Sequence, residues 1–226
     1  VPELKVFSVP YAFRDSKHYW RILDGELGQQ LLKAGERVRL KGLTYYDAGS
    51  RSFYSVAEAI NDPSDLQGKK IRVQNSITSV EMVRVLGGAA TPIPWSELYT
   101  ALQQGVVDGA ENNPPSYYLS RHYEIARYYS LDEHTSVPDV MLASLPVWES
   151  LNEQQKIWLT KAMEDSVEYQ RELWKTSTQA SLEKVKAEGV TVITPDKAPF
   201  VEAVKPFHKS FEGTPIGDLI TQIKAM

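Results

Sequence analysis

The sequence of 226 residues contains no cysteine, which excludes disulfides, thiolate metal sites and cysteine nucleophiles. No apolar run approaches the length that a membrane-spanning helix needs. The first residues, Val1 to Leu4, lack the basic start and apolar stretch of a secretory signal peptide. We therefore expect a chain that does not span a membrane and that is mature, trimmed or cytoplasmic.

Sequence motifs for common enzyme chemistry are absent as well. There is no Gly-x-Ser-x-Gly elbow, phosphate-binding loop or dinucleotide fingerprint. None of the four histidines, His18, His122, His134 and His208, is paired at the spacing of metal ligands. The net charge of −4 and the pI of about 5.7 argue against nucleic acid or an anionic membrane as the main partner. The sequence predicts neither a metal nor a cofactor.

What is present is the composition of an ordinary globular protein, with 42% hydrophobic and 24% charged residues. Helical and strand periodicities alternate along the chain, which predicts an α/β fold. Thr78 and Glu81 have the spacing of a helix capping box. A helix is predicted over His18–Lys33, and strands are predicted over Leu4–Phe7, Leu40–Asp47, Lys70–Gln74 and from Val106 to about Glu111.

One helical pattern is unusually long and runs from about Asn152 to Glu188. Asn152 and Gln155 fit a capping pair at its start, and Gly189 ends it. Its length would be about 55 Å at 1.5 Å per residue, which is more than one small domain needs. Two interpretations stay open on this pattern alone: the helix braces two lobes, or it lies on the surface of one domain.

Arg72 is the most conspicuous candidate for binding. It lies within Ile71-Arg72-Val73, a strand pattern in which Arg72 faces opposite to its two neighbours. A buried guanidinium needs an anion, and its planar fork suits a bidentate grip on a carboxylate. The alternatives are a solvated arginine on an edge strand or a structural ion pair.

Other candidates lie near the ends of predicted strands, where ligands bind in open α/β sheets. Arg51 follows the strand that ends at Asp47, Asn75 follows Arg72, and Glu111 and Asn112 end a further strand. Each has an alternative role in an ordinary loop or turn. Trp95 lies in a constrained loop after Pro94, where it lines a pocket or belongs to the core.

Two segments, Asp65–Asn75 and Thr91–Asn112, resemble the substrate-binding proteins of TRAP transporters, and Pro10–Asp15 and the long helix are similar too. The resemblance implies two α/β lobes that close on a ligand, with a helix at about 152–188 spanning both. It divides the chain into lobe I, residues 1–48 and 138–175, and lobe II, residues 49–137 and 176–226. It also implies further residues before Val1 that form the opening part of lobe I.

The same resemblance assigns roles to individual residues. Arg72 matches the arginine that binds the ligand carboxylate, and Arg51 matches a second arginine that assists it. Asn75, Trp95 and Asn112 match positions that line the cleft, and Glu111 adjoins them. At the end of the strand beside Arg51, Tyr46 and Asp47 are expected to meet ligand hydroxyls.

Functionally, the resemblance implies a monomeric periplasmic receptor that delivers a small carboxylate to a membrane permease driven by ion gradients. The segments Glu111–Ser116 and Asp132–Thr135 resemble the branch that binds sugar acids, so glucuronate or galacturonate is the expected ligand. A four-carbon dicarboxylate or a keto acid is the alternative ligand. The alternative of another class is an enzyme that processes a sugar acid, with His134 and nearby carboxylates as acid and base.

Overall fold

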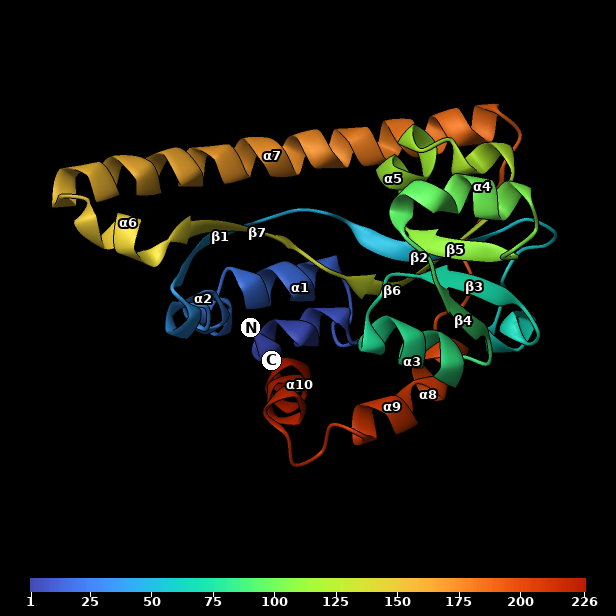
Figure 1. Ribbon diagram of the computed structural model, residues 1–226, viewed down its shortest axis with the longest axis horizontal. Coiled ribbons are helices and arrows are strands. Elements are labelled where there is room, and N and C mark those ends of the chain that lie inside the picture. Colours follow the sequence, from blue (N-terminus) through green and yellow to red (C-terminus); the bar gives the residue numbers. More distant parts are fainter.

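The computed structural model describes all 226 residues (Figure 1). Helices and strands alternate through most of the chain, as the sequence predicts. The strands are β1 Leu40–Tyr46, β2 Ser50–Ser55, β3 Lys70–Val73, β4 Ala89–Pro92, β5 Gly109–Asn112, β6 Tyr128–Ser136, β7 Asp139–Ser144 and β8 Thr191–Ile193. The helices are α1 Ser16–Leu23, α2 Glu26–Lys33, α3 Ile77–Val85, α4 Leu98–Gln103, α5 Pro114–Leu119, α6 Leu145–Ser150, α7 Glu153–Ala187, α8 Ala198–Ala203, α9 Lys205–Lys209 and α10 Pro215–Ala225.

A six-stranded mixed sheet forms the larger part of the molecule, with strand order β4-β3-β5-β2-β6-β8. Strand β3 pairs in parallel with β4 and β5, whereas β2 runs antiparallel to both β5 and β6. Successive side chains point to opposite faces of a sheet. Accordingly, Phe53 and Tyr54 of β2 are both fully buried but belong to two different hydrophobic clusters. The sheet is therefore covered on both faces.

The smaller part of the molecule has its own core. Strands β1 and β7 form a separate antiparallel pair. Beside them, residues of α1, α2 and the N-terminal segment form a third cluster that includes Phe7, Ile22 and Leu31. Ile220 and Ile223 of α10 also belong to this cluster. The chain's last helix thus packs with its first residues, whereas the expected grouping placed residues 176–226 together in lobe II; the boundary itself stays a prediction.

Helix α7 extends over both parts of the molecule (Figure 1). Asn152 and Gln155 form the predicted capping box at its start. Near its middle, Ser166 bonds to Tyr46 at the end of β1. Near its end, Val185 is buried in a cluster of the six-stranded sheet. The interpretation of a brace between two lobes is therefore correct, and that of a surface helix on one domain is wrong.

Three local predictions are wrong. Leu4–Phe7 is not a strand, because Pro2–Ser8 forms a 3₁₀ helix that buries Val6 and Phe7 in the core. The helix predicted over His18–Lys33 is two helices, since Gly25 has an extended backbone and a side chain there would meet the Arg21 carbonyl at 2.9 Å. The capping box at Thr78 does not form, because α3 already begins at Ile77.

Candidate functional site

A cleft of about 600 Å³ lies between the two parts of the molecule. We call it the front cleft. Arg51, Arg72, Trp95 and Asn112 of the predicted site all line it. They meet because β2 and β5 are antiparallel, with Ser52 opposite Asn112, and β3 lies next to β5. The remaining lining residues are Ser8, Ala48, Gln74, Asn113, Pro115, Ser116, Leu119, Ser120, Val137, Asp139 and Trp174.

Arg72 is almost completely buried, with 3% of its surface exposed, yet it forms no salt bridge. Its Nε donates to the Ile93 carbonyl at 2.8 Å, and its Cζ lies 5.4 Å from the ring centre of Trp95. Its Nη1 is buried without a hydrogen-bond partner. Burial lowers the pKa of Arg72 from its usual value. Both alternatives fail, because β3 is an interior strand and no carboxylate pairs with Arg72.

Arg51 has the opposite environment. It lies within β2 opposite Thr135 and not in a loop, which corrects its expected place after β1. Its Nε and Nη2 donate to the two carboxylate oxygens of Glu111 at 2.5 and 2.9 Å. Its Nη1 donates to the side-chain oxygen of Asn112 at 3.0 Å. Arg51 therefore brings positive charge to the cleft wall, but protein groups already occupy most of its donors.

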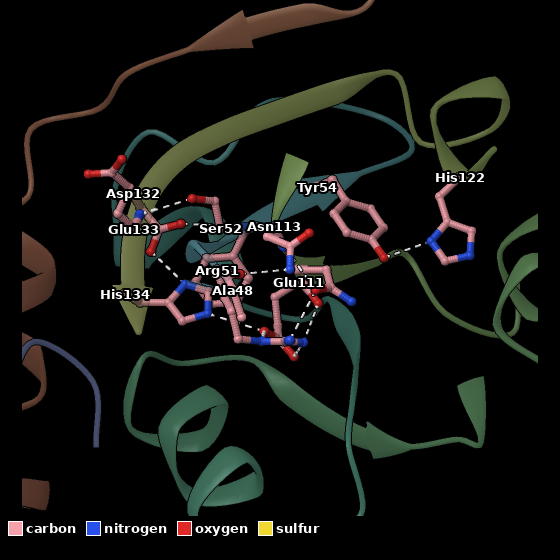
Figure 2. Close-up of polar contacts among 12 residues, drawn as sticks. Ala48, Arg51, Ser52, Tyr54, Glu111, Asn113, His122, Asp132, Glu133 and His134 are labelled. Atoms are coloured by element: carbon pink, nitrogen blue, oxygen red, sulfur yellow. Dashed lines mark hydrogen bonds and ion pairs between the residues drawn. The ribbon is translucent and has the colours of Figure 1, made fainter. Parts of the chain in front are cut away.

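The Arg51–Glu111 pair continues into a buried polar chain (Figure 2). His134 Nε2 lies 3.4 Å from Glu111, and His134 Nδ1 lies 2.8 Å from Asp132. Asp132 also accepts hydrogen bonds from the Tyr11 hydroxyl at 2.9 Å and from the Phe53 backbone at 3.0 Å. This chain joins the cleft wall to the N-terminal segment.

The charged groups of the buried chain determine one another's protonation states. Burial favours neutral forms, but the Arg51 charge and the bonds from His134 and Arg51 lower the pKa of Glu111 to about 2. Burial likewise opposes a charge on His134, but Asp132 and Glu111 raise its pKa to about 9. At neutral pH we therefore expect an ionised Glu111 and a protonated His134. Burying these charges costs desolvation free energy, and removing one of them leaves an uncompensated buried charge, which destabilises the fold.

Four predicted residues do not line the front cleft. Asn75 is exposed outside it, and its neighbour Gln74 lines it instead. Glu111 lies behind Arg51 as its partner. Tyr46 bonds to Ser166 through its hydroxyl at 2.8 Å. The backbone of Asp47 is held by Gln170 through two hydrogen bonds of 2.8 Å. Their expected contacts with a ligand stay predictions.

A second cleft, of about 540 Å³, lies on the other side of the connections between the two parts. Asp47, Gly49, Ser50 and Ser136 line this rear cleft, whereas Ala48, Arg51 and Val137 line the front cleft. Ser50 and Arg51 of β2 thus line opposite clefts, because successive side chains of a strand alternate in direction. Trp174 of α7 borders both clefts. Its spacing in the sequence indicates only a helix face, so sequence reasoning missed it.

No three His, Asp or Glu side chains are grouped so that they could hold a metal ion. No helix combines the length and the apolar character needed to cross a bilayer.

The sequence profile of the bacterial extracellular solute-binding proteins, family 7, matches residues 1–214. The chain belongs to this family. Members of this solute-binding family are receptors, and the family is not one of enzymes. A solute-binding protein of Chromohalobacter salexigens is 37% identical over 99% of the chain. The chain spans 68% of that relative's length.

Solved structures of TRAP periplasmic solute-binding proteins share the fold. A TRAP periplasmic solute-binding protein of Xanthobacter autotrophicus, with bound β-D-galacturonate, is 45% identical with a TM-score of 0.91 over 99% of the chain. A second, from Chromohalobacter salexigens with bound D-glucuronate, is 37% identical with a TM-score of 0.95 over the whole chain. This chain covers 75% and 76% of those two chains. The α/β fold of the TRAP receptors, predicted from the sequence, is thus confirmed.

Proposed function

We propose that this chain is the solute receptor of a TRAP transporter and that it binds a hexuronate such as D-glucuronate or D-galacturonate. The observation that carries the proposal is Arg72, a buried guanidinium that faces the front cleft without an anion. Burying an unpaired charge costs free energy, and a carboxylate bound to Arg72 would offset that cost. Two similar solved receptors hold uronates, which supports the same class of ligand here.

The wall around Arg72 suits the rest of a uronate. Asn112 and Ser116 present an amide and a hydroxyl to the cleft, and Gln74 adds a second amide. Such groups both donate to and accept from sugar hydroxyls. Trp95 adds an aromatic face. A guanidinium together with several neutral polar groups matches one carboxylate on a polyhydroxylated ring.

We infer that binding proceeds by closure of the two parts around the ligand. The front cleft takes lining residues from both, with Ser8 and Asp139 on one side and Arg51 and Arg72 on the other. A ligand that touches both sides favours the closed form by its additional contacts. Delivery to a membrane permease, a periplasmic location and a monomeric state complete the proposal.

The arrangement of His134 supports a receptor over an enzyme. His134 and Asp132 are fully buried and lie outside the front cleft, and Glu111 has only 2% of its surface exposed. All three are bonded to one another or to Arg51 and Tyr11. A general acid or base must reach the proton that it transfers. Groups that are buried and already paired in this way are suited to holding a fold.

The proposal is tested by a melting-temperature screen of the mature protein against uronates, aldonates, four-carbon dicarboxylates and keto acids. A ligand at a hundred times its Kd should stabilise the protein by about 2.7 kcal/mol. We expect the largest shift with a hexuronate. NMR of the recovered ligand should show it chemically unchanged. A larger shift with a dicarboxylate would make the dicarboxylate the proposed ligand in place of the uronate. If no acid shifts the melting temperature, the receptor proposal is overturned. A chemically changed ligand would indicate an enzyme.

A further inference from the structure

The exposed ring of Trp95 needs a further contact to hold it in place. Trp95 lies against Arg72 at the wall of the front cleft, but 41% of its own surface is exposed. It opens a short 3₁₀ helix, Trp95–Glu97, directly after Pro94. An aromatic ring that is free to turn would give the guanidinium no fixed face. The position of Trp95 therefore depends on what else packs against its ring.

That support is His122. The ring centres of Trp95 and His122 lie 5.0 Å apart at an interplanar angle of 59°. His122 has only 2% of its surface exposed. The preceding residue, Arg121, adopts a left-handed backbone with φ of 59°, which is unusual for a residue with a side chain. This turn of the chain precedes the short helix His122–Glu124, which presents the buried imidazole.

His122 is itself anchored to the core. Its Nδ1 lies 2.8 Å from the hydroxyl of Tyr54, a contact that stands apart from the Arg51 chain (Figure 2). Tyr54 is fully buried and packs against Tyr117 at 4.8 Å between ring centres. Burial and the nearby Arg72 charge lower the pKa of His122 to about 4. At neutral pH it is uncharged, so it places no second cation behind the clamp.

We propose that His122 is a positioning residue for the carboxylate site: it fixes Trp95 against Arg72 and thereby sets the shape of the clamp. The contacts form one series, from the Tyr54 core through the His122 imidazole and the Trp95 indole to the Arg72 guanidinium. His122 does not line the front cleft, so we expect it to act through Trp95 and not by contact with the ligand. This inference rests on the proposed function, since it names how the same site is held.

A double-mutant cycle tests the inference, with D-glucuronate as the probe and calorimetry as the readout. His122→Asn keeps a polar group near Tyr54 but removes the ring that packs against Trp95. We expect it to weaken binding about tenfold, because a cation–π contact of this kind contributes on the order of one decade in affinity. In a Trp95→Ala background the same change should alter affinity less than about twofold, since the path through Trp95 is gone.

His18→Asn is the matched control, because His18 is also a buried histidine with a hydrogen bond but lies on α1, next to Phe13 of the other core. It should leave affinity unchanged at a temperature well below melting. Equal losses from His122→Asn in both backgrounds would show that His122 acts without Trp95 and would overturn the inference. Absence of glucuronate binding by the unmodified protein would overturn the proposed function instead.

A second measurement needs no ligand. The indole N–H resonance of Trp95, assigned from its loss in Trp95→Phe, should move or broaden in His122→Asn and stay in place in His18→Asn. An unchanged resonance in His122→Asn would show that the imidazole does not hold the indole. This reading is independent of any effect of the substitution on overall stability.

Discussion

The two arginines of the front cleft lie on strands of one sheet, β2 and β3, which are separated by β5, yet their surroundings differ sharply. Arg51 is matched by Glu111 and Asn112 through four side-chain and backbone contacts of 3.0 Å or less. Arg72 has one backbone acceptor and a buried Nη1 without a partner. A charge that the fold has already neutralised stabilises the fold. A charge that the fold leaves unpaired is available to a ligand.

The largest effect that this comparison predicts is on stability. Glu111→Gln leaves the buried Arg51 charge without its counter-ion and should destabilise the protein by about 3–5 kcal/mol. Urea denaturation measures the free energy of unfolding. Glu81→Gln, which breaks an exposed pair with Arg84, is the control and should cost less than about 1 kcal/mol. If the two substitutions cost the same, the Arg51 pair is not the structural one.

Arg72→Ala should have the reverse effect. It should weaken uronate binding by about 2–5 kcal/mol, measured by calorimetry. The unfolding free energy of the ligand-free protein should stay the same or rise, because the substitution removes an unpaired buried charge. A large loss of stability with intact affinity would exchange the roles that we assign to the two arginines.

The pH dependence of stability provides a finer test of the Arg51 side. The folded pKa of His134, about 9, lies above its ordinary value of 6.5. Its contribution is therefore fully present below pH 6.5 and is lost as the pH rises toward 9. We expect the melting temperature to fall over this range, and less steeply in His134→Gln. His208→Gln is the control, because the pKa of His208 is lowered from 6.5 and therefore lies below the pH range of this test. Equal slopes in all three proteins would contradict the buried ion chain.

The smallest expected effect separates two neighbours at the end of β3. Gln74 lines the front cleft, whereas Asn75 does not. Gln74→Ala should weaken uronate binding by about 0.5–1.5 kcal/mol, the net value of one hydrogen bond. Asn75→Ala should change calorimetric affinity by less than that. A larger loss at Asn75 would restore its predicted place in the cleft and would require a rearrangement of β3 on closure.

The sequence predicts the elements of this site better than its pairings. The run Ile71-Arg72-Val73 predicts a strand and an arginine that needs an anion; the strand is confirmed and Arg72 is buried, whereas its anion stays a prediction. Alternation along β3 does not say whether that anion comes from the protein or from a ligand. For Arg51 the answer is Glu111, 60 residues away, and only the antiparallel pairing of β2 with β5 brings them together.

Residues that act through packing were the ones that sequence reasoning missed. His122 carries no motif, and its role depends on the turn at Arg121 and on ring contacts with Trp95 and Tyr54. The resemblance places Asn75 in the cleft, whereas its neighbour Gln74 lines it in this structure. A shift of one position in a strand moves a side chain to the other face. These differences are local: the fold is confirmed, and the role of Arg72 as the carboxylate clamp stays a prediction.

The rear cleft gives this receptor a place where closure can be observed without disturbing the ligand. It is bounded by α1 on one side and by the last turns of α7 on the other, so a rotation that narrows the front cleft would widen it. These 226 residues contain no cysteine. A single cysteine in place of Gln179, which lines the rear cleft, would therefore be a unique attachment point for a dye. The labelled protein would be a fluorescent sensor for its own ligand.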